Sequence, residues 1–195
     1  IELDDWKIQG DSLQFQLFDL DGITSVDVNR LWFRGHLFNN SDKAFAKMEL
    51  PDTLSKASIR NSDLIILGNT DDQSLFTYHS GNGSDSTDYY RQLFQAENLT
   101  IKKQSQDAND LYLIYPRDSA LTMAQNIFMH GDIDQMHLYR LTTLTDIAKS
   151  SIVKNIYKIN GAQFEKVDSA LWNYDQQVNS LWTQTGSDIY FTGGN

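Results

Sequence analysis

The sequence contains no cysteine, and this absence removes several kinds of chemistry at once. Disulfide bonds, thiolate nucleophiles and cysteine-ligated zinc or iron–sulfur sites are all excluded. Exported proteins of Gram-positive bacteria often lack cysteine, so we expect an extracytoplasmic or cell-surface protein of such a bacterium. The sequence starts at Ile1 without a methionine, so we also expect that an export signal, a lipoprotein anchor or a neighbouring domain preceded it.

Glutamate and basic residues are also scarce. There are 4 Glu against 22 Asp, and 16 Lys and Arg against 26 acidic residues, which gives a net charge of −10. Aspartate favours turns and caps because its short side chain bonds nearby backbone groups, whereas glutamate favours helix interiors. The balance predicts a turn-rich, strand-rich, acidic surface that repels phosphate backbones and anionic lipids. We therefore expect no nucleic-acid partner.

Long apolar runs are missing. Uninterrupted stretches such as Leu64–Leu67 are only a few residues long, whereas a membrane-spanning helix needs roughly 20 apolar residues. We expect no transmembrane segment. At 195 residues the chain is predicted to form a single domain over 1–195, with a possible subdivision near residue 60 into a strand-rich 1–60 and a mixed 61–195. No internal repeat at a fixed period is apparent.

Strand patterns dominate the first part of the sequence. Leu13–Leu17 alternates apolar and polar residues, as a half-buried strand does, and Ala44–Leu50 forms a run that stops at Pro51. Further strands are predicted over residues 30–38, 63–68, 74–79, 99–103, 111–115 and 136–141.

Apolar residues at helical spacing indicate helices further on. Ser86 is a candidate N-cap for a helix reaching Glu97, and Asp118 for a second helix that ends at Gly131. The second helix would carry Leu121, Ala124, Ile127 and Phe128 on one face.

The longest periodic stripe lies near the C-terminus and predicts an amphipathic helix over about 168–182. Residues 147–167 stay open, because Asn160-Gly161 is a strong hairpin signal and yet the same glycine could end a helix. The sequence therefore predicts an α+β fold, strand-rich over the N-terminal two-thirds, with helices toward the C-terminus and an amphipathic helix at the end. The stripe consists of Phe164, Val167, Leu171, Tyr174, Val178 and Leu181.

The segment Phe18-Asp-Leu-Asp-Gly-Ile23 resembles the first motif of the haloacid-dehalogenase-type phosphatases, in which a buried strand ends in Asp-x-Asp-Gly-Thr. The resemblance implies Asp19 as nucleophile, Asp21 at the leaving group, and magnesium neutralising the phosphate. The strand before it carries alternating glutamines, and a strand-like run follows it. A turn between two strands is therefore the interpretation that we favour.

Two other acidic pairs, Asp71 with Asp72 and Asp132 with Asp134, carry the oxygen ligands that calcium prefers. Close pairs arise by chance among 22 aspartates, so we expect no cofactor and regard these pairs as solvated turns. Calcium is the ion to test there.

Aromatic residues are abundant, with 10 Phe, 9 Tyr and 4 Trp. Sugar rings stack on aromatic faces while aspartate and asparagine bond the hydroxyls, so the composition suits glycan binding. Trp182, Tyr89 and Tyr90 are the predicted ligand-binding residues.

The predicted function is a non-catalytic extracytoplasmic domain that binds a polysaccharide or a protein partner, as part of a larger surface- or lipid-anchored bacterial protein. The alternative is a glycan- or ester-cleaving hydrolase that uses an Asp pair, with Asp19 and Asp21 or Asp71 and Asp72 as candidates.

Overall fold

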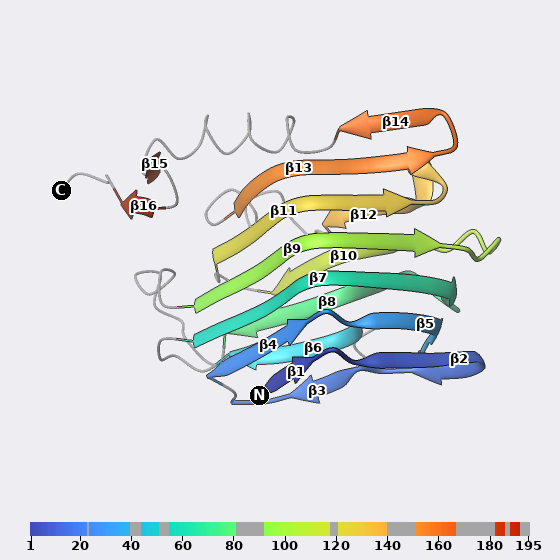
Figure 1. Ribbon diagram of the computed structural model, residues 1–195, viewed down its shortest axis with the longest axis horizontal. Helices are drawn as coiled ribbons and strands as arrows, with labels where there is room; N and C mark the ends of the chain where they lie inside the picture. The colour runs from blue at the N-terminus through green and yellow to red at the C-terminus, as the bar shows by residue number, and fades with distance from the viewer. Residues whose placement is uncertain are drawn as a thin grey trace.

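A computed structural model shows the protein as a coil of parallel strands (Figure 1). The structure describes residues 1–22, 24–39, 44–50, 55–80, 92–117, 121–139, 151–166, 182–185 and 188–191. One large sheet, sheet A, contains β1 (Glu2–Asp4), β2 (Lys7–Phe15), β4 (Ser25–Asn29), β5 (Trp32–Leu37), β7 (Ser55–Gly68), β9 (Gln92–Lys103), β11 (Leu121–His130), β13 (Ser151–Asn160) and β14 (Gln163–Lys166). A second sheet, sheet B, contains β3 (Phe18–Leu20), β6 (Ala44–Leu50), β8 (Gln73–Ser80), β10 (Leu111–Arg117) and β12 (Met136–Tyr139), the last preceded by the short 3₁₀ helix η2 (Ile133–Gln135).

The chain alternates between the two sheets, and each turn pairs in parallel with the turn before it. In sheet A the order is β1, β4, β7, β9, β11, β13, and in sheet B it is β3, β6, β8, β10, β12. Only two pairs of strands among the described residues are antiparallel, β13 with β14 and β15 (Trp182–Thr185) with β16 (Asp188–Phe191). This arrangement is a β-solenoid. Strand β7 continues across residue 60, and the predicted division into domains stays a prediction.

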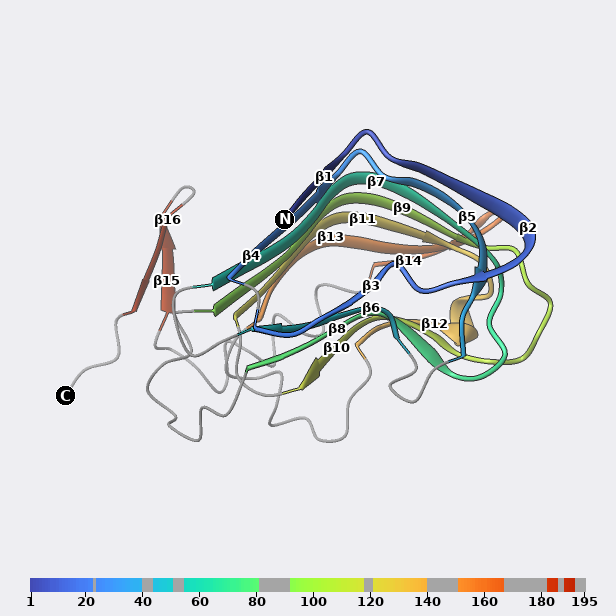
Figure 2. The same ribbon diagram turned by 90° about the horizontal axis from the view of Figure 1, so that it is seen from below.

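Sheet A bends sharply in the middle, so that two arms of it and sheet B enclose the interior (Figure 2). The bend is built at residues that hold a left-handed backbone, with φ between 53° and 58°. Asparagine tolerates this conformation better than most residues, because its short side chain can bond locally. The bend residues, one per turn, are Asp5, Arg30, Asn61, Asn98, Asn126 and Asn155.

The asparagines at the bend form a hydrogen-bonded ladder along the stack. Each side-chain amide donates to the side-chain oxygen one turn earlier, from Asn155 through Asn126, Asn98 and Asn61 to Asn29, at 2.9–3.0 Å. The last amide, that of Asn29, donates to the Asp4 carboxylate at 2.8 Å, and Arg30 binds the same carboxylate. The ladder therefore ends, in the first turn, on a group that can only accept hydrogen bonds.

The interior consists of apolar rows that run through successive turns. On the first arm of sheet A, Val28, Ile59, Ala96 and Ala124 are in register and at most 2% exposed. On the second arm the corresponding buried row is Phe33, Leu64, Ile101 and Met129. Stacking equivalent positions buries them on both sides, which is how a solenoid builds one continuous core.

The predicted α+β class is wrong, because the described residues are dominated by strands and contain no α-helix. The predicted helix reaching Glu97 falls on β9 where the structure describes it, and the helix predicted over 118–131 falls on β11. The bend explains the error. One left-handed residue interrupts the alternation, so that Ala96 and Leu99, or Ala124 and Ile127, are both buried although three residues apart. Buried residues three positions apart are typical of a helix, so the sequence pattern indicated helices here.

The chain near Asn160 forms a hairpin, which was the other alternative for that segment. β13 and β14 pair antiparallel on either side of Gly161, whose φ is +58°. Phe164, the first residue of the predicted helical stripe, therefore lies in a strand. The predicted amphipathic helix over 168–182 falls almost wholly outside the described residues, and its last residue, Trp182, begins β15.

No helix in the described part of the chain is long and apolar enough to cross a membrane.

Candidate functional site

The outer surface of the second arm of sheet A carries a stack of three aromatic rings. Phe128 and Tyr157 are register partners on β11 and β13, with ring centroids 5.4 Å apart and planes within 17°. Phe164 on β14 continues the stack, 5.2 Å from Tyr157 and within 23°. Their neighbours Ile127, Met129 and Ile156 point into the core, so the rings point outward. Phe128 is 41% exposed and Phe164 63% exposed, and we call these three residues the aromatic stack.

The stack belongs to an outward row of residues that lie two positions after each bend residue. Because the bend sets the same phase in every turn, this offset places one side chain per turn on the same line. In the first two turns Lys7 lies over the ring of Trp32, 4.8 Å from its centroid. The row consists of Lys7, Trp32, Asp63, Thr100, Phe128 and Tyr157.

Two polar residues, Lys102 and His130, lie on the same face as the aromatic stack, two positions after Thr100 and Phe128. His130 is the register partner of Lys102 on β9 and of Ile159 on β13. Burial and the charge of Lys102 both lower the pKa of His130 below the ordinary histidine value of 6.5. The imidazole is therefore neutral at pH 7 and can both donate and accept a hydrogen bond. Lys166, the register partner of Tyr157 on β14, is exposed on the same strand as Phe164.

These groups together offer apolar ring surface next to neutral and cationic hydrogen-bond donors. In an acidic chain, exposed basic side chains on one sheet face are a local departure from the average charge. Such a surface suits a ligand that has apolar C–H faces and many hydroxyl groups.

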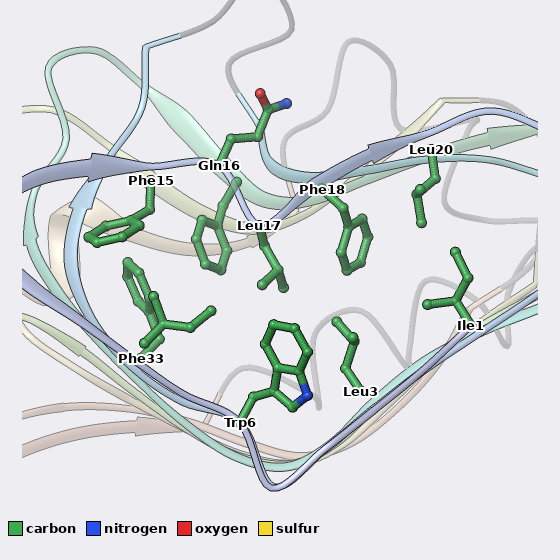
Figure 3. Close-up of a pocket in the computed structure, with 11 residues that line it drawn as sticks. Ile1, Leu3, Trp6, Phe15, Gln16, Leu17, Phe18, Leu20 and Phe33 are labelled. Carbon is green, nitrogen blue, oxygen red and sulfur yellow. The ribbon is translucent and has the colours of Figure 1, made fainter.

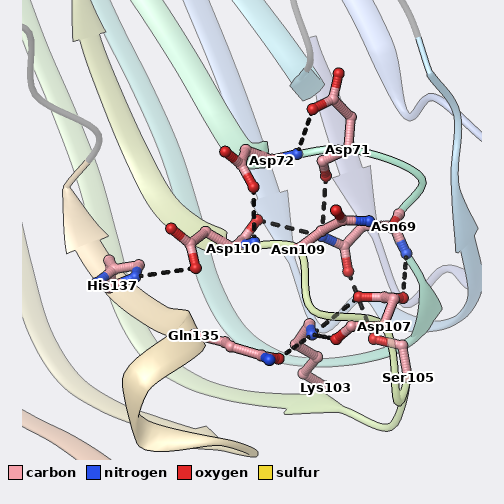
Figure 4. Close-up of polar contacts among 10 residues, drawn as sticks. All are labelled: Asn69, Asp71, Asp72, Lys103, Ser105, Asp107, Asn109, Asp110, Gln135 and His137. Carbon is pink, nitrogen blue, oxygen red and sulfur yellow. Dashed lines mark hydrogen bonds and ion pairs between the residues drawn. The ribbon is translucent and has the colours of Figure 1, made fainter.

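A second cluster of polar side chains lies where sheet A passes into sheet B (Figure 4). Its centre is Lys103, whose side chain is only 1% exposed. The ammonium group contacts the Asp107 carboxylate at 3.0 Å, the Asp107 carbonyl oxygen at 3.0 Å and Gln135 Oε1 at 2.7 Å. Burial opposes ionisation of Asp107, but hydrogen bonds led by that from Lys103 outweigh it and lower the pKa of its carboxyl. The cluster thus satisfies a buried charge and joins three consecutive turns.

The predicted calcium ligands Asp71 and Asp72 lie in this cluster and bind backbone groups. Asp71 Oδ1 accepts from the N–H of Asp72 at 2.8 Å, and Asp72 Oδ1 accepts from the N–H of Asp110 at 2.9 Å. The Asp110 carboxylate lies 3.5 Å from His137 Nε2 and accepts from the Tyr112 hydroxyl at 3.1 Å. These oxygens stabilise the turns between the sheets.

The other acidic pairs are exposed and separate from these clusters. Asp132 caps η2 by accepting from the N–H of Asp134 at 3.0 Å. Asp19 lies on β3, 53% exposed and 3.7 Å from Lys47, and Asp21 lies between β3 and β4 beside Gly22, whose φ is +66°. Among the described residues no group of three or more His, Asp or Glu side chains could hold a metal ion.

The predicted ligand-binding residues are placed only in part. Trp182 lies in β15, paired with Phe191, whereas Tyr89 and Tyr90 lie outside the described residues. The aromatic stack was not among the residues predicted from the sequence to bind a ligand. Asn126 and Asn155 lie two residues before Phe128 and Tyr157, and this offset becomes a signal only once the bend residues are known.

No protein-family model, curated protein or solved structure matches this chain.

Proposed function

We propose that this chain is a non-catalytic binding domain that holds a polysaccharide on the aromatic stack. The observation that carries the proposal is the exposure of Phe128 and Phe164 in one stack with Tyr157 on a regular sheet face. A sheet surface presents its side chains at the spacing of its strands, so it suits an extended ligand with repeating units. We assign the domain to an extracytoplasmic, surface- or lipid-anchored protein of a Gram-positive bacterium, on its lack of cysteine and its acidity.

Several features make a polysaccharide the favoured ligand. The exposed rings supply apolar faces for sugar C–H groups, and neutral His130 beside them can exchange hydrogen bonds with hydroxyls in both directions. Lys102 and Lys166 add donors, which would also admit sugars that carry acid groups. The Asp71 and Asp72 carboxylates each accept a backbone N–H, which favours the binding domain over the hydrolase alternative for that pair.

The test is affinity electrophoresis of the purified chain in gels containing cell-wall or plant polysaccharides. We expect at least one polymer to retard the protein, and Phe164→Ala and Phe128→Ala to weaken the retardation at least tenfold, about 1.4 kcal/mol. Leu13→Ala is the matched control, because Leu13 is 58% exposed on β2 and distant from the stack in sheet order.

Trp182→Ala tests the remaining predicted residue in the same gels. We expect it to lower the affinity without unfolding the protein. Retardation that survives both phenylalanine substitutions would contradict the assignment to the aromatic stack. Titration with NaCl separates neutral from acidic polymers, since only binding to an acidic polymer weakens as salt screens the lysines.

A further inference from the structure

The aromatic stack lies within a regular patch of outward-facing positions on the second arm of sheet A. Four neighbouring strands, β9, β11, β13 and β14, each contribute two of these positions, which form two rows along the direction in which the turns stack. The rows lie about 7 Å apart, and neighbouring members of one row lie about 4.8 Å apart. We call these positions the outer patch. The first row is Thr100, Phe128, Tyr157 and Lys166, and the second is Lys102, His130, Ile159 and Phe164.

Two further aromatic rings are strongly exposed in the described part of the chain, but neither belongs to a stack on the outer surface. Trp6 is 50% exposed, and Figure 3 shows its ring between sheets A and B, pointing toward Leu17. Phe38 is 42% exposed and stacks on no other ring of the described residues. A long ligand therefore finds several exposed rings side by side on the outer patch.

The outer patch is basic, although the whole chain has a net charge of −10. Its positions hold two lysines, one histidine and no carboxylate. The closest carboxylate in the sequence, that of Glu165, lies on the opposite side of β14, where it is 3.5 Å from the Lys158 ammonium. In the first row the next residue beyond Thr100 is Asp63 on β7, so the basic area ends there.

Lys102 carries the argument for the charge of the ligand. It is exposed and has no carboxylate partner among the described residues, whereas Arg34 and Arg60 contact the Asp11 and Asp27 carboxylates at 2.8 and 2.5 Å. The charge of Lys102 reaches the next strand, because it adds to the effect of burial in lowering the pKa of His130. An ammonium group beside exposed rings and without a counter-charge is complementary to a ligand that carries acid groups.

We propose that the polysaccharide held by the aromatic stack is acidic, and that the Lys102 ammonium pairs with an acid group on one of its sugar units. This inference rests on the proposed function, because it names the chemical class of the ligand at the same site. The rings bind the sugar chain, and Lys102 selects the chains that carry acid groups.

The net negative charge of the protein is compatible with an acidic ligand. At physiological ionic strength the Debye length is about 8 Å, so carboxylates far from the outer patch are largely screened. The charges within the outer patch then decide the local potential, and Lys102 is the exposed cation that lies next to His130 and diagonal to Phe128.

Two matched pairs of polymers test the charge of the ligand directly. Polygalacturonate is compared with its methyl ester, and dextran sulfate with dextran, by isothermal titration calorimetry of the whole chain at physiological ionic strength. We expect the acidic member of at least one pair to bind about fivefold or more tightly than its neutral counterpart, the effect of one favourable exposed ion pair. The pair that responds distinguishes a carboxylate from a sulfate ligand. Equal affinities within both pairs, or no binding of either acidic polymer, would overturn the proposal.

Variants of Lys102 assign the effect to one side chain. Lys102→Gln should lower the affinity for the acidic polymer about fivefold and leave the affinity for a neutral polymer unchanged, and Lys102→Arg should keep the affinity for both. Lys56→Gln is the matched control, because Lys56 is exposed on the first arm of β7 and its substitution changes the net charge equally. An equal loss of affinity in Lys102→Gln and Lys56→Gln would contradict the assigned role of Lys102.

Two further measurements separate this inference from the proposed function. Phe164→Ala should weaken the binding of acidic and neutral polymers alike, whereas Lys102→Gln should affect only the acidic ones. A loss with Phe164→Ala and none with Lys102→Gln would leave the polysaccharide site standing and overturn the acidic ligand. Poly-L-glutamate carries charge without sugar rings, and we expect it to bind more weakly than the acidic polysaccharide. Equal binding would overturn the proposal, since charge alone would then explain it.

Discussion

Asn98 donates its side-chain amide hydrogen to Asn61 Oδ1 at 2.9 Å, although 37 residues separate them in the sequence. Both residues hold a left-handed backbone, with φ of 54° and 53°, at the bend of sheet A. One residue type thus meets two requirements, because asparagine tolerates the backbone conformation and bonds to the same residue in the next turn.

Asn98→Ala should lower the free energy of unfolding by about 2 kcal/mol, since it removes the ladder bonds and strains a left-handed backbone. Asn98→Gly keeps that backbone relaxed and should cost about 1 kcal/mol, mostly for the bonds. Urea denaturation of the two variants measures the difference. Equal losses would show that the backbone conformation contributes nothing.

Asp107→Asn should destabilise the protein by about 2 kcal/mol, because it leaves the Lys103 ammonium buried without its counter-charge. The figure is below the full cost of a broken buried pair because the Asp107 side chain is 28% exposed. Lys103→Met is the comparison variant. The register partner of Lys103 in the preceding turn is the apolar Ile66, so this position accepts an apolar side chain. We expect this variant to lose less stability, and a larger loss would contradict the assigned role of the charge pair.

Acidification should destabilise the protein through His130. Because the pKa of His130 is lowered in the folded state, the unfolded chain takes up a proton first as the pH falls below about 6.5. The loss of folding stability grows until the pH falls below the pKa of His130 in the folded protein, and it is constant at lower pH. His130→Gln should therefore lose less stability than the unmodified protein between pH 7.5 and pH 5, as measured by urea denaturation.

The acidic groups act in a lower range of pH, which allows the two effects to be separated. The pKa of Asp27 is lowered, since hydrogen bonds from Arg60 and Ser58 outweigh the effect of its burial. The stabilising contribution of ionised Asp27 is complete above about pH 3.8, the pKa of an aspartate in the unfolded chain. It is lost as the pH falls through the lower pKa of Asp27 in the folded protein. A pH dependence that is identical in His130→Gln would mean that His130 makes no contribution.

Gly35→Ala should cost about 2 kcal/mol, because a Cβ at Gly35 would lie 2.6 Å from the ring of Phe15. Gly22→Ala is the control for backbone strain alone, with φ of +66° and no atom within 4 Å of the added carbon, and should cost about 1 kcal/mol. Thermal unfolding compares the two. A smaller loss for Gly35→Ala would show that the Phe15 ring moves aside without penalty.

The errors of the helix prediction have one physical origin. A strand with a single left-handed residue buries side chains at spacings of two, then three, then two, as Phe94, Ala96, Leu99 and Ile101 do. A search for either regular alternation or helical spacing misreads such a strand. The repeat was also hidden, because successive ladder asparagines are 32, 37, 28 and 29 residues apart.

The candidate site was missed for a related reason. Phe128, Tyr157 and Phe164 are unremarkable in the sequence, and only parallel pairing and the hairpin bring their rings together. The acidic pairs were visible in the sequence, but whether a carboxylate is free or bonded depends on the backbone that approaches it. Asp72, for example, accepts from Asp110, 38 residues away.

By itself the sequence determined the chemistry that is absent, the acidic and turn-rich surface, individual strands such as Ala44–Leu50 and a strong hairpin signal at Asn160-Gly161, because composition and local backbone preference decide these. The tertiary structure alone decided that the strands stack in parallel turns and which side chains form rows. Each strand pairs with a segment about one turn away in the chain, and local pattern carries no information about that partner.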